Sequence, residues 1–269
     1  MSPAKITALY TYPIKSCAPI SRSRSACSTS GLVDDREYVI VCAKSNKILT
    51  QRDLPHMARL KPELSEREHL IIRGLDGTEA LIPRQVDGEI LTLNLWGNTY
   101  EGIDQGKEIA EWLSHQLGLS CRLLKKLTDH EQASRHRPDN TRFDASFVDC
   151  CPLSVVFAEE VQELNTRLAI PVEMSRFRPS IVIEGVSAAE HQNLKLIRTE
   201  NSVLTYIRPI ARCIVINVDQ ERGIIAGTDC LKELAAYRMV NQKAVLGHYF
   251  FAAEPGNISV GETLTVCAK

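Results

Sequence analysis

Short apolar segments, many of them rich in Val and Ile, recur along the whole chain, and turn residues separate them at close intervals. Alternation of apolar and polar residues, or a brief apolar run between turns, is typical of β-strands. Strands are therefore predicted throughout the chain, for example at Lys5–Tyr12, Glu37–Ala43, His69–Arg73, Glu89–Leu95, Leu153–Phe157, Ser180–Glu184, Val203–Arg208, Cys213–Val218 and Thr263–Val266. This pattern restricts the chain to a fold made mainly of β-sheet.

Helical periodicity is confined to a few segments. It is clearest in Lys107–Leu119, where apolar residues recur at three- and four-residue spacing, and shorter helices are predicted at Ala158–Leu168 and Leu231–Arg238. The polar segment Thr128–Arg142 has no apolar period, so we expect a loop or linker there. The expected fold class is mainly β with a few helices (α+β). The expected domains are two β-rich units, residues 1–124 and 125–269.

Charge and composition exclude several classes of protein. Lys and Arg total 32 against 33 Asp and Glu, a formal net charge of −1, so the chain lacks the basic excess typical of nucleic-acid-binding proteins. Apolar runs stay short of the roughly 18 residues of a membrane-spanning helix, and the first residues lack a signal-peptide pattern. We therefore expect a cytoplasmic protein without nucleic-acid or membrane partners. The nine cysteines are scattered without a CxxC pair, which favours free, mostly buried thiols.

Basic residues lie in or beside several predicted strands. Arg176 and Arg178 are two positions apart in an apolar context, and on a strand they would share one face. One such arginine can reach solvent along its stem, but two indicate a bound anion. Lys15 and Ser16 follow the first predicted strand and could hold an anion through ammonium, hydroxyl and backbone NH groups.

A further pair, Arg212 and Cys213, adjoins an apolar strand. A guanidinium beside a thiol favours the thiolate, which is the metal-binding and nucleophilic form. The alternative is a structural cysteine beside a surface arginine. Because the chain has neither a glycine-rich nucleotide loop nor a Gly-x-Ser-x-Gly elbow, the residues themselves favour an anionic, phosphorylated cofactor next to a soft metal or a reactive sulfur.

Several short motifs occur in the order seen in MOSC proteins: Tyr12–Cys17, Asp35–Arg36, Leu49–Pro55, Leu164–Leu168, Phe177–Pro179, Arg212–Cys213 with Val218–Asp219, Leu234–Arg238 and Gly247–Phe250. Over almost its whole length the chain resembles proteins in which an N-terminal MOSC β-barrel domain precedes a MOSC β-barrel domain. Mitochondrial amidoxime-reducing components and bacterial reductases of N-hydroxylated compounds have this organisation.

The resemblance implies a molybdenum cofactor, a pyranopterin dithiolene with a terminal phosphate (Mo-molybdopterin). It assigns Cys213 as the catalytic residue and as the protein thiolate that ligates the metal. The cofactor-binding residues that it implies are Lys15, Ser16, Arg36, Cys150, Cys151, Arg178, Ser180, Ala211, Arg212 and Tyr249. The resemblance also carries a family-level association with pyridoxal phosphate binding.

Cys150 and Cys151 stand where MOSC proteins commonly have small polar cofactor contacts. Neighbouring residues of a strand point to opposite faces, so we expect one thiol to face the pocket and the other to pack in the core. Adjacent Cα atoms, about 3.8 Å apart across a trans peptide, are too close for an ordinary disulfide, so both thiols should be free. The alternative is that both fill the core beside Pro152.

The activity implied by the resemblance is that of an oxidoreductase. Reduced molybdenum would take oxygen from small N-hydroxylated compounds, such as amidoximes, hydroxylamines and N-hydroxylated purines. Electrons would come from a separate donor, a ferredoxin-, flavodoxin- or cytochrome b5-type reductase. Two alternatives share the fold and the cysteine: Cys213 carries a persulfide, as in cofactor sulfurases, or the chain stores or delivers the cofactor.

Overall fold

The computed structural model describes residues 4–65, 69–83, 86–95, 98–127, 131–133, 142–144, 146–187, 190–191, 193–227 and 229–268. Strands make up most of the regular structure there, so the predicted fold class is confirmed. The three predicted helical segments are also confirmed, as α1 (Lys107–Leu117), α2 (Ala158–Asn165) and α4 (Cys230–Tyr237). No helix in these residues is both long and apolar enough to cross a membrane.

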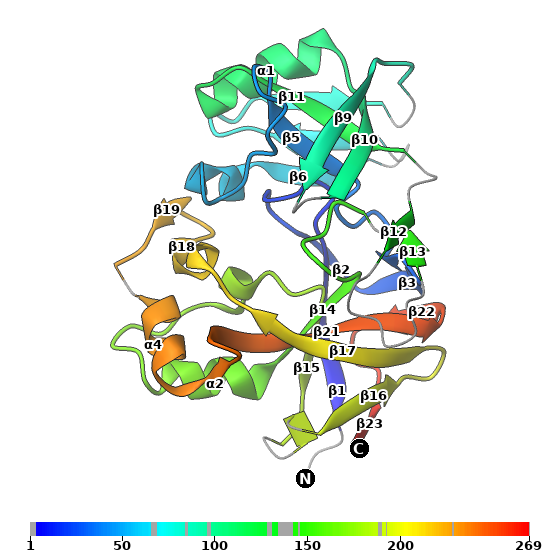
Figure 1. The fold of residues 1–269 in the computed structure, drawn as a ribbon, viewed down its shortest axis with the longest axis vertical. Helices are drawn as coiled ribbons and strands as arrows, with labels where there is room; N and C mark the ends of the chain where they lie inside the picture. The colour runs from blue at the N-terminus through cyan, green and yellow to red at the C-terminus, as the bar shows by residue number, and fades with distance from the viewer. Residues whose placement is uncertain are drawn as a thin grey trace.

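A large sheet forms the lower part of the molecule in Figure 1. Its strands in spatial order are β2 (Ile20–Arg22), β1 (Lys5–Thr11), β15 (Ile181–Glu184), β14 (Leu153–Phe157), β21 (Lys243–Glu254), β17 (Val203–Ala211), β16 (Leu194–Arg198) and β23 (Thr265–Ala268), and β20 (Met239–Val240) adds to β21. Neighbouring strands are antiparallel except β14 and β15, which α2 connects in the chain.

The first strand of the chain lies inside this sheet. β1 pairs with β2 on one side and with β15 on the other, where Ile6 faces Ile183 and Leu9 faces Ile181. The start of the chain is thereby hydrogen-bonded to a strand from its second half, and the blue strand β1 runs among green strands in Figure 1.

Smaller sheets and α1 form the upper part of the molecule (Figure 1). One sheet has the order β5 (Tyr38–Cys42), β11 (Cys121–Lys126), β10 (Asn98–Asp104) and β9 (Ile90–Leu95), and another has the order β6 (Lys61–Leu64), β7 (Leu70–Arg73) and β8 (Glu79–Ile82). Apolar side chains from these strands and from α1 pack together, among them Ile40, Leu70, Leu113 and Leu123.

The remaining described elements are short. β22 (Gly256–Ser259), β3 (Arg24–Ser28) and β4 (Gly31–Leu32) form one small sheet, and β18 (Val218–Asp219) pairs with β19 (Ile224–Ile225). β12 (Glu131–Ala133) pairs with β13 (Arg142–Asp144). The 3-10 helices are η1 (Pro55–Arg59), η2 (Met174–Phe177) and η3 (Ile214–Asn217).

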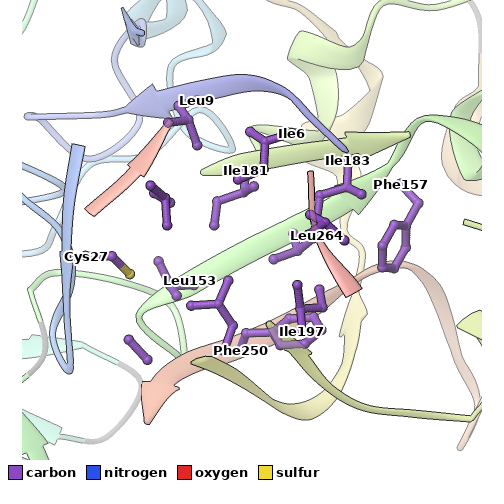
Figure 2. Close-up of a cluster of buried hydrophobic side chains, with 14 of the residues drawn as sticks. Ile6, Leu9, Cys27, Leu153, Phe157, Ile181, Ile183, Ile197, Phe250 and Leu264 are labelled. Atoms are coloured by element: carbon purple, nitrogen blue, oxygen red, sulfur yellow. The ribbon is translucent and has the colours of Figure 1, made fainter. Parts of the chain in front are cut away.

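On one face of the large sheet, every second residue of β14 and β15 points into the core. Leu153, Val155 and Phe157 alternate along β14, and Ile181 and Ile183 alternate along β15; all five are fully buried. Figure 2 shows this cluster with Phe250 of β21 beside Leu153. Full burial of each large side chain contributes roughly 1.5–3 kcal/mol, so the sheet is a rigid platform for the residues at its ends.

Two local predictions were wrong. Cys213–Val218 was expected to be a strand, but β17 ends at Ala211 and η3 begins at Ile214. The 3-10 turn buries Ile216 in the cluster that includes Leu234 of α4, and this tertiary contact outweighs the β-branched composition. Thr128–Arg142 was expected to be a loop or linker, yet β12 lies within it; residues 128–130 and 134–141 are outside the described residues.

Candidate functional site

A cavity of about 300 Å³ lies between loops of the first half of the chain and the end of the large sheet. The first half contributes lining residues Lys15, Ser16, Arg36, Gln51 and Arg52. The second half contributes Asp149, Cys150, Cys151, Arg176, Arg178, Arg208, Ala211, Arg212, Cys213 and Tyr249. The structure therefore brings every residue assigned from the resemblance into the wall of one cavity, with the exception of Ser180.

Ser180 lies behind the wall and is fully buried. Its hydroxyl accepts a hydrogen bond from Nη1 of Arg36 at 3.2 Å, and it lies 3.2 Å from the hydroxyl of Ser154. Ser180 thus contacts the cavity through Arg36, which it helps to orient. The sequence predicted a direct contact of Ser180 with a bound group. Because Ser180 is buried behind the wall, it supports Arg36 instead.

Tyr12 holds two of the cavity arginines in place. The guanidinium carbons of Arg36 and Arg178 each lie 4.3 Å from the centre of the Tyr12 ring. Burial raises the pKa of the Tyr12 phenol to about 12, so the ring remains neutral between the two cations. Cation–π contacts of this kind contribute roughly 0.5–2 kcal/mol each, and here they keep two like charges side by side.

Three residues in the cavity wall have left-handed backbone conformations that are uncommon outside glycine. The φ angles are 70° at Ser16, 53° at Arg36 and 49° at Arg178. Such conformations cost on the order of 1 kcal/mol each and persist where surrounding contacts enforce them. η2 ends directly before Arg178, so Arg176 and Arg178 do not alternate along a strand as expected. The turn, rather than strand alternation, directs both side chains to the cavity.

Arg212 is fixed by backbone oxygens. Its Nε donates to the Leu246 carbonyl at 2.7 Å, and its Nη1 donates to the Phe177 carbonyl at 2.9 Å. The third nitrogen, Nη2, is buried and has no hydrogen-bond partner among the described residues. Gly247 makes room for it, because a Cβ there would lie 2.9 Å from Nη2.

Glu160 of α2 contacts β21 at Gly247, the residue that makes room for Arg212. Its Oε1 accepts from the Gly247 backbone NH at 3.1 Å, is 3.2 Å from Nε2 of His248, and forms an ion pair with Arg238. Burial by itself would raise the pKa of Glu160, but the hydrogen bond with His248 and the nearby positive charge lower it to about 2. We call Glu160, Arg238 and His248 the carboxylate cluster.

The thiol of Cys213 contacts a cation from the other half of the chain. Nη2 of Arg52 lies 3.2 Å from Sγ of Cys213, whereas the neighbouring Arg212 turns away toward backbone oxygens. The sequence predicted Arg212 as the guanidinium beside this thiol; in the structure Arg52 takes that position instead. Arg52 lies in one of the recognised motifs, although no role was assigned to it from the sequence.

A pair of glutamines joins the two halves at the cavity wall. Nε2 of Gln51 donates to Oε1 of Gln220 at 3.0 Å, and Nε2 of Gln220 donates back to Oε1 of Gln51 at 2.9 Å. Gln51 also donates to the Ser16 carbonyl at 2.8 Å, and Gln220 accepts from Nη1 of Arg178 at 3.1 Å. Sequence reasoning missed this pair because 169 positions separate its members and a lone glutamine carries no periodic signal.

Lys15 and Tyr249 complete the polar wall. Nζ of Lys15 donates to the Phe147 carbonyl at 3.0 Å and pairs with Asp149 at 2.5 Å. Burial lowers the pKa of Lys15, and Asp149 partly offsets this. Burial also raises the pKa of Tyr249, so its phenol remains a neutral hydrogen-bonding group.

Cys150 and Cys151 are free thiols, as predicted, but they do not point to opposite faces. Their Sγ atoms are 2.9 Å apart, and both residues line the cavity. The reason is that β14 begins only at Leu153, so strand alternation does not apply to them. Nη2 of Arg208 lies 2.9 Å from Sγ of Cys150.

The fold and the cavity together define a mainly β protein with a basic, thiol-lined site between its two halves. Residues 3–120 match the family model of the MOSC N-terminal beta barrel domain, and residues 142–265 match the MOSC domain. The chain therefore belongs to the MOSC family, with the N-terminal barrel domain preceding the MOSC domain. The domain limits at residue 125 and the binding roles of the wall residues remain predictions.

Named relatives match most of the chain. It is 26% identical over 278 residues to mitochondrial amidoxime reducing component 2 of Bos taurus, covering 96% of this chain and 81% of the relative. Mitochondrial amidoxime-reducing component 1 of Mus musculus is 26% identical over 275 residues, covering 96% and 80%. Molybdenum cofactor sulfurase of Oryza sativa subsp. japonica is 26% identical over 267 residues, covering 92% of this chain but 32% of that protein.

Proposed function

We propose that this chain binds a molybdenum cofactor in the cavity and uses it to reduce small N-hydroxylated compounds. The observation that carries the proposal is the placement of the Cys213 thiol in a cavity wall that is otherwise rich in guanidinium groups. A soft sulfur ligand and a set of anion donors within one cavity match a cofactor that carries both a metal and a phosphate.

The charges of the wall support a bound anion. Among the described residues, neither Arg178 nor Arg212 forms an ion pair with a carboxylate, and the Nη2 group of Arg212 has no acceptor. Burial lowers the pKa of both guanidiniums, yet an arginine stays charged at neutral pH. Buried cations without an anion are costly. A terminal phosphate would supply the missing acceptors, so the residues present fit the cofactor.

Each part of the wall then has a distinct task. Cys213 would ligate the metal. Arg52 would hold the sulfur of Cys213 in place and balance the charge of its thiolate. Arg36 and Arg178, held by Tyr12, would orient the phosphate. When bound, the cofactor supplies two-electron redox chemistry and an acceptor for the substrate oxygen. The protein contributes ligation, orientation and a positive field.

The test is anaerobic turnover of benzamidoxime by protein expressed with cofactor supply, with a chemical reductant in place of the donor protein. We expect about one molybdenum per chain and formation of benzamidine. Metal-loaded protein that leaves both benzamidoxime and N-hydroxylated purines unchanged would contradict the proposal. In cells, electrons would come from a separate ferredoxin-, flavodoxin- or cytochrome b5-type donor, and the expected cytoplasmic location remains a prediction.

A second candidate function is sulfur transfer, with Cys213 as a persulfide carrier. It is favoured by the match to a plant molybdenum cofactor sulfurase over 92% of this chain. Metal analysis separates the two functions, because a carrier needs no stoichiometric molybdenum. Purified protein without the metal but with a cyanide-labile sulfur on Cys213 would favour the carrier.

A further inference from the structure

A second thiol site lies in the cavity wall, apart from the Cys213 thiol. It consists of Cys150, Cys151 and Arg208. The two Sγ atoms are 2.9 Å apart, and Nη2 of Arg208 lies 2.9 Å from Sγ of Cys150. Cys151 is 3% exposed, whereas Cys150 is half-buried, so Cys150 is the sulfur that a molecule in the cavity reaches first.

The contacts of Cys150 favour its thiolate. The hydrogen bond with Cys151 lowers the pKa of Cys150, and Arg208 lowers it further, while burial acts in the opposite direction. The same hydrogen bond raises the pKa of Cys151, so Cys150 is the thiol of the pair that ionises first. Nε of Arg208 is buried without a hydrogen-bond partner among the described residues and adds an unused donor beside the sulfur. A thiolate with these neighbours is a nucleophile.

We propose that Cys150 is a modification site that reacts with small anionic disulfides entering the cavity. The Cys150 thiolate attacks one sulfur of the disulfide RSSR and forms a Cys150–S–S–R bond. The S–S bond of RSSR breaks, and RS⁻ leaves as the thiolate. Cys150 is oxidised and the departing sulfur is reduced, so no further oxidant is needed.

Cys151 cannot readily displace the adduct. An intramolecular disulfide would join residues whose Cα atoms are about 3.8 Å apart, below the usual range of roughly 4.4–6.8 Å. Cys151 therefore acts as a hydrogen-bond donor to Cys150 and does not resolve the mixed disulfide. The adduct persists until an external thiol removes it.

The charge of the cavity selects anionic reagents. Its described lining contains the cations Lys15, Arg36, Arg52, Arg176, Arg178, Arg208 and Arg212, against the single carboxylate of Asp149. Such a field raises the rate of encounter with anions by tenfold or more at low salt. An adduct with carboxylates would occupy the cavity of about 300 Å³ and contact the same cations, so it would exclude other anions until reduction.

The test measures disulfide exchange in a chain that lacks the other half-exposed thiols, with the substitutions Cys42→Ser, Cys213→Ser and Cys267→Ser. The probes are 5,5′-dithiobis(2-nitrobenzoate), which is anionic, and neutral 2,2′-dithiodipyridine. Adducts of the first probe and of glutathione disulfide are located by peptide mass spectrometry. A matched chain that retains Cys42 but has Cys150→Ser gives the intrinsic ratio of the two probe rates at a thiol outside the cavity.

We expect one fast-reacting thiol, an adduct on Cys150, and an anionic-to-neutral rate ratio about tenfold above the ratio at Cys42. The excess should disappear in high salt, fall on Arg208→Gln and be partly restored by Arg208→Lys. In the wild-type chain, which needs no substitution to fold, inorganic phosphate should slow labelling of Cys150 and leave that of Cys42 unchanged. Three results would overturn the proposal. The first is a mass loss of two hydrogens without an adduct, which would indicate a disulfide between Cys150 and Cys151. The others are equal ratios of the two probe rates at Cys150 and Cys42, and labelling of Cys150 only after unfolding. Failure of the molybdenum assay would leave these readouts unaffected.

Discussion

Two groups of charges adjoin Gly247, and they are built differently. In the carboxylate cluster, Glu160 accepts hydrogen bonds from a backbone NH and a histidine and pairs with Arg238. In the cavity wall, Arg178 and Arg212 donate to uncharged oxygens and form no ion pair with a described carboxylate.

The difference separates charges that are paired within the fold from charges that our proposal assigns to a ligand. In the carboxylate cluster the negative charge of Glu160 is paired with Arg238 inside the protein, although Nδ1 of His248 is buried without a hydrogen-bond partner among the described residues. The cavity keeps a surplus of positive charge at a cost in desolvation, which an incoming anion recovers on binding. Gly247 connects the two groups. Its backbone NH donates to Glu160, and because it has no side chain it leaves room for Arg212.

The largest effect is expected from Cys213→Ser, which removes the metal ligand and leaves both charge groups intact. Activity should fall by about a thousandfold or more, because a hydroxyl is a harder and far less acidic ligand than a thiol. Metal content and benzamidoxime turnover measure this, with Cys267→Ser as the silent control. Phosphate affinity should be unchanged. A metal-loaded Cys213→Ser protein with full activity would refute the assignment.

Glu160→Gln should destabilise the fold, because it removes the negative charge of the carboxylate cluster. The pKa of Glu160 in the fold is about 2 against 4.5 for the free side chain, a difference of about 3 kcal/mol in the free energy of unfolding. A lowered pKa means that this stabilisation is complete above pH 4.5 and is lost as the pH falls toward 2. Urea denaturation should therefore show a gap of about 3 kcal/mol at pH 7 that narrows at low pH.

The matched control for this prediction is Glu163→Gln. Glu163 is half-exposed and lies 3.9 Å from Arg238, so its loss should change the stability by less than about 1 kcal/mol. A gap between wild type and Glu160→Gln that stays constant from pH 7 to pH 3 would show that the carboxylate charge does not stabilise the fold.

Arg178→Gln should weaken anion binding and leave the stability of the fold nearly unchanged. We expect inorganic phosphate to bind about thirtyfold more weakly, a loss of about 2 kcal/mol from one charge-assisted contact. The stability of the cofactor-free protein should change little, because no carboxylate loses its partner. Calorimetric titration and urea denaturation measure the two quantities, and the control is Arg198→Gln, at an exposed side chain of β16. A large loss of stability with unchanged phosphate affinity would assign Arg178 to the fold.

The smallest effect is expected from phosphate itself. At about ten times its dissociation constant, phosphate should stabilise the wild-type chain by about 1.4 kcal/mol and raise Tm by about 3 °C. Sodium chloride at equal ionic strength should raise it less. Glu160→Gln should keep the phosphate-induced rise and Arg178→Gln should lose most of it. An equal rise in chloride would remove the distinction between the two groups.

Sequence reasoning predicted the sheet better than it predicted the site geometry. Short apolar runs rich in Val and Ile marked β14 and β15, which bury residues on both faces, and helical spacing marked α1. The residues that line the cavity were named from motifs. Their placement depends on left-handed turns at Ser16, Arg36 and Arg178, which have no periodic signal.

The missed contacts all join distant parts of the chain. Arg52 reaches Cys213 across 161 positions, and Gln51 reaches Gln220 across 169. Hydrophobic periodicity carries information about the immediate neighbours of a residue and about its burial, but not about which distant polar group it meets. Strand alternation also failed at Cys150 and Cys151, because they lie outside the regular strand to which the rule applies.

During synthesis, β1 is made long before β15, one of the two strands with which it pairs. Thr7 of this strand contacts Val182 of β15, 175 positions later. At synthesis rates of roughly 5–20 residues per second, the apolar first strand waits on the order of 10–30 s for that partner. During this interval β1 has only β2 to pair with, and its other edge is open to other chains. We therefore expect the large sheet to be completed only after β15 has emerged from the ribosome.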